Sequence, residues 1–391
     1  MSPRCGRRDS LLTTRVTHPE RRHNHALDGV RGLAILIVLI HHGLLPVPAN
    51  GRLSHVLAPF IHSCWIGVDL FFALSGFLIT GILVDTLGSR EYLRNFYVRR
   101  FLRIFPLYYA VLLLAGLTSL LLYGNSGLWR MMLPLAVYLQ NTGLWTPLDH
   151  YNIPPFTLNH FWSLAVEEQF YTVWPLLVFW IRDRSKLLRL ALALSVCALL
   201  LRVYLSARGV SPWFLYSFTA CRADALLLGG ALALLFRSEK APVVAAVRHY
   251  APWCGLLAFA AVVIVSFRVD GLDWYGDARL HTYGFTLLAI AACGLLATTQ
   301  GDAPRVLSQP WLRFLGKYSY GLYVLHRLFT ASLIHALHHW LLPVLRSDNV
   351  SSIAAWTLAW AFTLGLTMAS FRWFESPFLR LKHRFEYTRT A

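Results

Sequence analysis

Histidines and acidic residues occur inside apolar stretches of this sequence, where a titratable side chain is costly to bury. His41 and His42 follow one apolar run, and Glu167 and Glu168 lie near the start of another. A histidine exchanges protons near neutral pH, because its ordinary pKa is about 6.5. A carboxylate can orient an imidazole. The pattern therefore indicates proton transfer, or group transfer through a histidine.

Helix geometry relates His42 to Arg31, which precedes it by 11 positions. At about 100° per residue the two side chains lie within roughly 20° of one face, about 16 Å apart along the axis. His41 points about 80° away from Arg31. His42 therefore shares a face with Arg31 and His41 does not. The alternative is that all three anchor the helix at a membrane surface.

The two acids belong to a patterned segment. Ser163, Glu167 and Tyr171 recur every four residues, so they share one helix face, whereas Glu168 points about 100° away. Two adjacent acids at a membrane entry are hard to explain by packing. We expect them to orient or activate a histidine, and the alternative is a solvated pair at the outer surface.

Three arginines form a compact basic cluster, Arg99, Arg100 and Arg103, between the second and third apolar runs. Guanidinium groups match the geometry of phosphate oxygens. The cluster could bind phosphates, or it could signal topology or contact lipid head groups. Taken alone, the cluster favours the second interpretation.

Other charged residues also lie inside apolar runs. Asp69 needs a partner if it is buried, and Arg222 and Asp224 need partners on other helices because they point to nearly opposite faces. His326 is followed directly by Arg327. The cysteines form no CxxC pair, so no metal site is expected.

Composition indicates a membrane protein. The 391 residues are 56% hydrophobic and only 14% charged, against about 25% charged in ordinary soluble domains. A net charge of +17 could suggest nucleic acid binding. However, the basic residues flank apolar runs and form no continuous stripe, so a nucleic acid partner is not expected.

Apolar runs of about 20 residues are long enough to cross a bilayer as helices. We predict an all-α, polytopic bundle of about ten spans, with a disordered cytoplasmic tail at 1–26, a transmembrane domain at 27–376 and a cytoplasmic tail at 377–391. The predicted spans are 27–47, 62–84, 104–123, 161–181, 187–206, 215–236, 250–267, 281–299, 318–341 and 353–374.

The distribution of Lys and Arg predicts the orientation. With the N-terminus in the cytoplasm, 26 of these residues fall on the inner side and 7 on the outer side. Arg202 counts among the outer residues. Because cytoplasmic loops are enriched in Lys and Arg, we expect both termini to be cytoplasmic.

Taken together, the motifs of this sequence resemble those of the acyltransferase-3 family of bacterial membrane acyltransferases. They follow the family order over about residues 24–380. The motifs are Asp28 to Arg31 with His42, Gly67 to Thr80, Arg99 to Pro106, Trp162 to Tyr171, Arg222 with Asp224 and Gly229, Ser319 to His326, and Glu375 with Pro377.

The resemblance implies an enzyme of the bacterial cytoplasmic (inner) membrane. It implies an acyl-CoA donor, usually acetyl-CoA, and an acceptor hydroxyl on a cell-surface glycan, a lipid-linked sugar or a secreted small molecule. We expect His42 to act as general base or to carry the acyl group transiently, and the sequence leaves both open. Glu167 would hold the imidazole tautomer and Arg31 would steer the donor. Phosphates would bind Arg99, Arg100 and Arg103, and the supporting residues are Asp28, Asp69, Ser163, Tyr171, Arg222, Asp224 and His326.

Two other classes of protein use buried charges. A transporter or proton-coupled permease would use them as a relay, but the inverted repeats typical of many transporters are not found in the sequence. A non-catalytic scaffold or receptor would leave the His42–Glu167 arrangement without a role. Hydrolysis of a thioester by the purified protein would distinguish the enzyme from both.

The charge asymmetry generates a test of topology. A cysteine introduced near Asp149, in the longest predicted outer loop, should react with a membrane-impermeant thiol reagent added to whole cells. A cysteine introduced at Arg389 should react only after the cells are permeabilised. Labelling of the Arg389 site from outside would contradict the predicted orientation.

Overall fold

The computed structural model describes residues 24–44, 52–124, 128–144, 152–153, 156–266, 275–301 and 303–387. Residues 1–23 of the predicted N-terminal tail and residues 388–391 of the C-terminal tail lie outside this part. Its regular structure is helical, apart from a short antiparallel hairpin of β1 (Asn152–Ile153) and β2 (Phe156–Thr157), in which Asn152 is opposite Thr157. The prediction of an all-α bundle is therefore confirmed.

The helices follow one another along the chain with few long connections. Their bounds are α1 (His25–Leu39), α2 (Arg52–Ser63), α3 (Gly67–Asp85), α4 (Tyr92–Tyr123), α5 (Leu128–Ala136), α6 (Trp162–Ile181), α7 (Arg184–Ala207), α8 (Pro212–Ser217), α9 (Thr219–Leu235), α10 (Ala241–Ser266), α11 (Phe285–Thr298), α12 (Pro310–Leu345), α13 (Asp348–Ala369) and α14 (Ser376–Leu381). Short π-helical turns follow α1 (η1, Ile40–Leu44), precede α11 (η4, Leu280–Gly284) and follow α13 (η6, Ser370–Glu375). A 3-10 turn follows α14 (η7, Lys382–Phe385).

Nine helical segments in the described residues are long and apolar enough to cross a membrane. The chain is thus a multi-pass membrane protein, in which helices satisfy the hydrogen bonds of the backbone within lipid. Each of the ten predicted spans overlaps at least one helix of the described residues. The fourth, α6, is not among the nine, because Glu167, Glu168 and Gln169 lower its hydropathy.

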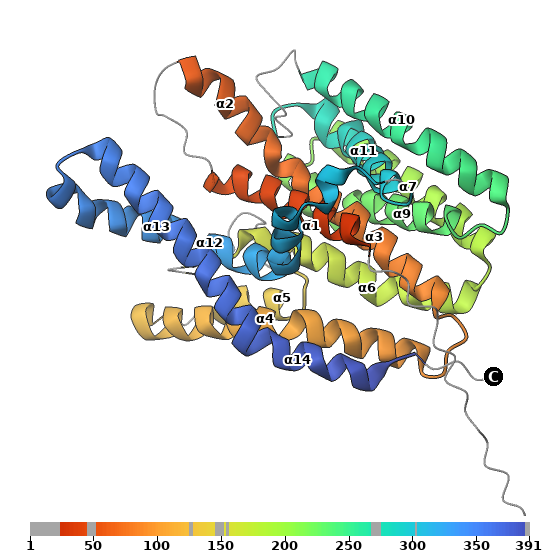
Figure 1. Cartoon of the computed structure of the whole chain (residues 1–391), viewed down its shortest axis with the longest axis horizontal. Coiled ribbons are helices and arrows are strands. Elements are labelled where there is room, and N and C mark those ends of the chain that lie inside the picture. Colours follow the sequence, from red (N-terminus) through yellow and green to blue (C-terminus); the bar gives the residue numbers. More distant parts are fainter. Residues whose placement is uncertain are drawn as a thin grey trace, which may run out of the picture.

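The helix α6 lies inside the bundle, in contact with α3 and α9 on one side and α4 on the other (Figure 1). Most of its first half is buried, including Ser163, Glu168 and Tyr171. Around this centre α1 packs against α12 and α3, while α10 packs against α11. A helix that carries acids is therefore kept within protein rather than against lipid.

A close crossing in this core joins α3 and α9. A Cβ atom on Gly76 would lie 1.8 Å from the backbone oxygen of Leu226, and a Cβ atom on Gly229 would lie 2.0 Å from that of Ala73. Small residues allow helix backbones to approach closely in membranes. Gly76 and Gly229 therefore allow α3 and α9 to pack closely.

Two positional expectations were wrong. The basic cluster is helical and not part of a connection, because α4 begins at Tyr92, twelve residues before the predicted span. Residues 92–105 contain no Gly or Pro, so the helix continues through the arginines to Pro106. Arg202, which we counted on the outer side, lies within α7 and is fully buried, because Asp224 supplies its counter-charge.

The α3–α9 crossing generates a stability prediction. Replacing Gly76 with Val places a branched side chain against the Leu226 backbone, which has no room to move without separating the helices. We expect a lower melting temperature in detergent and loss of the monodisperse size-exclusion peak, because overpacking typically costs about 1–3 kcal/mol or more. Gly365→Val on α13, where a Cβ meets no atom within 4 Å, is the matched control and should behave as wild type. Equal stability of both variants would contradict the tight crossing.

Candidate active site

A cavity inside the bundle gathers residues from five helices. Arg31 comes from α1, and Arg100 and Arg103 come from successive turns of α4. Because residues three apart share a helix face, Arg100 and Arg103 point into the same space. The other polar residues of the lining are Ser75, Ser163, Glu167, Glu168, Tyr171, Ser319, Tyr320 and Tyr323. The structure thus brings Arg31, Arg100, Arg103, Ser163, Glu167 and Tyr171 to one cavity.

Glu167 is held within this cavity by hydroxyl groups. Ser75 Oγ donates a hydrogen bond of 2.6 Å to Glu167 Oε1, and the side chain of Tyr171, one turn along α6, also bonds to this carboxylate. Arg100 and Arg103 act on it electrostatically. In the described residues no hydrogen bond joins Glu167 to His42. The contacts of Glu167 therefore lie with the arginines and hydroxyls of the cavity.

A second cavity adjoins the first, because Arg31, Arg100 and Arg103 line both. Its remaining lining residues are Ile82, Phe96, Arg99, Lys382 and Tyr387. Asp28 pairs with Arg31 at 3.1 Å, one helical turn away. The predicted basic cluster is therefore gathered at one place, with the cationic cavity on one side and the Glu167 cavity on the other.

His42 lies at a kink after α1, where His42 and Gly43 leave the helical conformation, and it contacts His326 of α12. His42 Nδ1 is 2.9 Å from the carbonyl oxygen of Val38. His326 Nδ1 is 3.1 Å from the carbonyl of Leu322 and 2.8 Å from that of Tyr323. A carbonyl oxygen only accepts hydrogen bonds, so each Nδ1 carries a proton and donates.

These tautomers determine whether each remaining ring nitrogen carries a proton when the ring is neutral. His326 Nε2 has a free lone pair and accepts from His42 Nδ1, 3.2 Å away. His42 Nε2 is then unprotonated when the ring is neutral, and it is able to accept a proton or to attack a carbonyl carbon. His326 and a backbone carbonyl thus take the orienting position that the sequence suggested for Glu167.

The turn that carries His42 is held by two tryptophans of α13. The indole Nε1 atoms of Trp356 and Trp360 donate to the carbonyl of Gly43 at 2.8 Å and 3.1 Å. Gly43 has φ +95°, a conformation that favours glycine. Sequence reasoning missed this contact, although indoles four residues apart on one helix face are a usable signal.

The neighbouring His41 has a different environment. Its Nδ1 lies 3.3 Å from the carbonyl of Ile61 on α2, and its ring centroid is 4.9 Å from that of His42. His42 alone of the two contacts His326. His42 is thus paired with a histidine of α12, whereas His41 lies against the backbone of α2.

Hydroxyl groups lie between the cavity and the histidines. Ser163 Oγ and Tyr323 OH are hydrogen-bonded to each other, and both line the cavity. Tyr323 OH donates to the carbonyl of His160 at 3.0 Å, and the His160 ring lies 5.0 Å from that of His326. The sequence had given His160 no role, and its position links the Glu167 cavity to the histidine pair.

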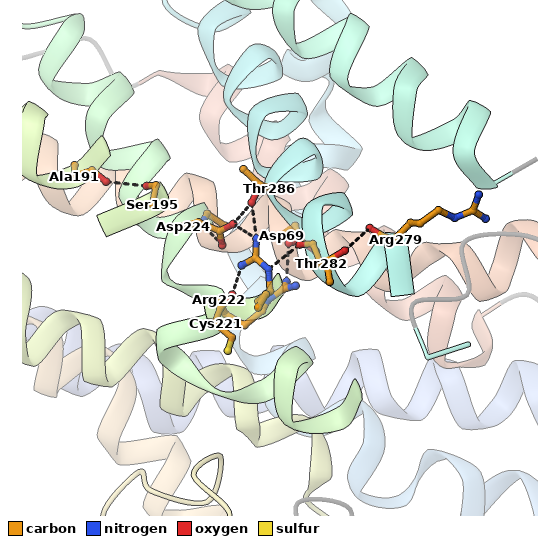
Figure 2. A network of polar contacts seen from close by, with 11 residues as sticks. Asp69, Ala191, Ser195, Cys221, Arg222, Asp224, Arg279, Thr282 and Thr286 are labelled. Carbon is orange, nitrogen blue, oxygen red and sulfur yellow. Dashed lines mark hydrogen bonds and ion pairs between the residues drawn. The ribbon is translucent and has the colours of Figure 1, made fainter. Parts of the chain in front are cut away.

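Asp69, Arg222 and Asp224 belong to a separate network (Figure 2). Arg222 donates to Asp69 of α3 at 2.6 Å, and Arg202 of α7 donates to Asp224 at 2.7 Å. Thr286 of α11 also donates to Asp224, at 2.6 Å. The prediction that Arg222 and Asp224 need partners on other helices is confirmed. These pairs join α3, α7, α9 and α11, and removing one member typically costs about 3–5 kcal/mol.

Curated proteins similar to this chain are acetyltransferases by name. The peptidoglycan O-acetyltransferase OatA of Listeria monocytogenes is 29% identical over 332 residues, which cover 80% of this chain and 50% of that protein. A putative peptidoglycan O-acetyltransferase of Bacillus subtilis is 29% identical over 79% of this chain and 49% of its own length. A putative O-acetyltransferase of Staphylococcus aureus is 26% identical over 92% of this chain and 58% of its own. The chain thus spans about half the length of these relatives.

No solved structure matches the chain. A family model for an acyltransferase domain matches residues 24–372, which include the cavity, the histidine pair and the buried ion pairs. Because this match covers nearly the whole chain, the chain belongs to the acyltransferase-3 family.

Proposed function

We propose that this protein transfers an acyl group, most simply acetyl, from cytoplasmic acyl-CoA to a hydroxyl of a cell-surface glycan, from a position in the bacterial inner membrane. The observation that carries the proposal is the pair of adjoining cavities, one cationic and one lined by Glu167 and hydroxyls, together with the contacts through Tyr323 and His160 that lead from the second cavity to the histidine pair. The names of the relatives favour peptidoglycan as the glycan. Acceptors such as a lipid-linked sugar or a secreted small molecule have the same chemistry.

The cationic cavity suits the phosphates of coenzyme A. Arg99, Arg100 and Arg103 would bind these phosphates through charge-assisted hydrogen bonds. The thioester arm would then extend along Arg31 into the cavity of Glu167, because Arg31 lines both spaces. This path leads from the basic cluster toward Ser163 and the histidines.

His42 would act as the base for the acceptor. The hydroxyl proton moves to His42 Nε2, and the hydroxyl oxygen forms a bond to the thioester carbonyl carbon. The carbon–sulfur bond breaks, and the thiolate of coenzyme A takes the proton back from the imidazolium. His326 and the Val38 carbonyl stabilise the imidazolium through Nδ1. A transient acyl group on His42 would use the same Nε2, and both routes remain open.

Glu167 would act on the donor side. Its bonds to Ser75 and Tyr171 and its proximity to Arg100 and Arg103 support a role in ordering the cavity where the thioester arm lies. We had expected it to orient His42. Its contacts instead support a role as the counter-charge of Arg100 and Arg103 when no donor is bound.

The transporter alternative is not favoured. The match to an acyltransferase family model and the names of the relatives account for the buried histidines without a transport cycle. The test is chemical, because a transporter would leave the acyl thioester intact.

The histidine geometry generates the first functional prediction. His42→Ala should abolish acyl transfer, whereas His41→Ala should retain much of it, because His42 Nδ1 is paired with His326, whereas His41 Nδ1 lies against the carbonyl of Ile61. Loss of a general base typically costs about 10²–10⁴-fold in rate. The measurement is mass spectrometry of O-acetyl groups on surface glycans from a deletion strain carrying each variant, with rates from purified protein. His41→Ala serves as the matched control for folding and for loss of an imidazole.

Two outcomes would contradict the assignment. One is equal loss of transfer in both variants with both proteins folded. The other is full activity of His42→Ala. An acyl adduct on His42, trapped by rapid acid quench and found by peptide mass spectrometry, would instead select the covalent route.

The cationic cavity generates a prediction about the donor. Arg103→Gln should raise the apparent KM for acetyl-CoA about tenfold or more with a smaller change in kcat, because a hydrogen bond to a charged group contributes about 1.5–3 kcal/mol. Arg90→Gln is the control, since Arg90 is exposed and lies outside both cavities. If Arg103→Gln lowers only the amount of folded protein and leaves KM unchanged, the cluster is a topology signal.

A further inference from the structure

The chain beyond α14 folds back over the cationic cavity. Asn95 donates to the carbonyl of Glu386 at 3.0 Å, and Arg99 donates to those of Lys382 and Phe385 at 3.2 Å and 3.3 Å. Figure 1 shows α14 beside α4, on which this segment ends. Of the predicted tail 377–391, the described part up to 387 is thus docked on α4, and Arg99 is one of the residues that hold it.

The docked segment adds a cation where cations already gather. Lys382 lines the cavity together with Arg31, Arg99, Arg100 and Arg103, and the four guanidinium groups act electrostatically on its ammonium group. No acidic residue is part of the lining within the described residues. Asp28 pairs with Arg31 and Glu167 acts on Arg100 and Arg103 from the inner cavity, but among the described residues no salt bridge joins Arg99 or Lys382 to an acid. Basic groups gathered in this way are stabilised by an anion that binds among them, so the arrangement indicates a polyanionic ligand.

The lining of the two cavities indicates how the proposed acyl-CoA donor would lie across them. Glu167 lines only the inner cavity, Lys382 lines only the cationic cavity, and Arg100 and Arg103 line both. If the pantetheine arm passes Glu167 and carries the thioester toward His42, the pyrophosphate of coenzyme A lies beside the shared arginines. The phosphorylated ribose, at the far end of the molecule, then lies beside Lys382.

We propose that Lys382, carried by the docked C-terminal segment, binds the 3′-phosphate of the acyl-CoA donor. This inference rests on the proposed function and adds a donor-binding residue outside the arginine cluster. Lys382 selects coenzyme A over the same molecule without its 3′-phosphate. Arg99 contributes by fixing the segment, since its Nη1 is bonded to two carbonyls of that segment.

The test compares two ligands and two variants of the purified, full-length protein. Dissociation constants for coenzyme A and for 3′-dephospho-coenzyme A are measured by calorimetry with wild type, Lys382→Gln and Arg384→Gln. We expect wild type and Arg384→Gln to bind coenzyme A about tenfold more tightly than the dephospho form, and Lys382→Gln to bind the two about equally. Arg384 is the matched control because it lies in the same 3-10 turn, is exposed and lines neither cavity.

Any other result contradicts the assignment of Lys382 to the 3′-phosphate. The results differ in whether they also contradict acyl-CoA as the donor. Full discrimination in Lys382→Gln, equal weakening of both ligands, or no discrimination in wild type would remove Lys382 from the 3′-phosphate while leaving the donor proposal intact. Failure of wild type to bind coenzyme A would remove the donor proposal itself. Repeating the titration in nanodiscs with phosphatidylglycerol separates a lipid source of phosphate. If phosphatidylglycerol weakens coenzyme A binding to wild type but not to Lys382→Gln, Lys382 binds lipid head groups instead.

Discussion

A charge buried in an apolar bundle must meet an opposite charge or a ligand. This constraint divides the buried basic residues into two sets. Arg202 and Arg222 have their acids, Asp224 and Asp69, within 2.7 Å, so their charges are balanced within the protein. In the described residues, no salt bridge joins Arg100, Arg103 or Lys382 to an acid. The first set holds helices together, and the second set indicates a place for an anion.

The two ends of the proposed reaction path are built differently. At the cationic end, long and flexible side chains from α1, α4 and the C-terminal segment surround an open space. At the reacting end, His42 and His326 are tied to backbone carbonyls through Nδ1. A ring held by the backbone keeps one tautomer and one direction for Nε2, which a proton transfer requires. Flexible arginines, by contrast, suit phosphates whose positions vary between donor and product.

Helix periodicity predicted which side chains share a helix face, but not which residues of other helices they contact. The regular spacing showed that Arg222 and Asp224 need separate partners, yet it gave no means of naming Asp69 or Arg202, which lie on α3 and α7. The approximate positions of the long helices followed from the apolar runs, because lipid imposes a minimum length on any helix that crosses it. The basic cluster was placed in a connection for the same reason, since a hydropathy pattern ends a span where charges begin even when the helix continues.

The residues that the sequence left unassigned are those whose positions depend on breaks in the helices. Within α1 the spacing of about 100° applies, but from Ile40 to Leu44 the chain forms a π-helical turn with Gly43 at φ +95°, so the angle between His41 and His42 is set by tertiary contacts. The indoles of Trp356 and Trp360 hold that turn from α13, about 300 residues further along the chain, beyond the reach of any local pattern. Lys382 follows the same logic, because Arg99 and Asn95 dock its segment through backbone carbonyls that carry no sequence signature. In both places a side chain proposed to react or to bind ligand is positioned by a hydrogen-bond donor that binds the backbone near it. Such contacts do not depend on the identity of the residue whose backbone is bound, so the spacing of the donors can show that they share a face but not which segment they hold.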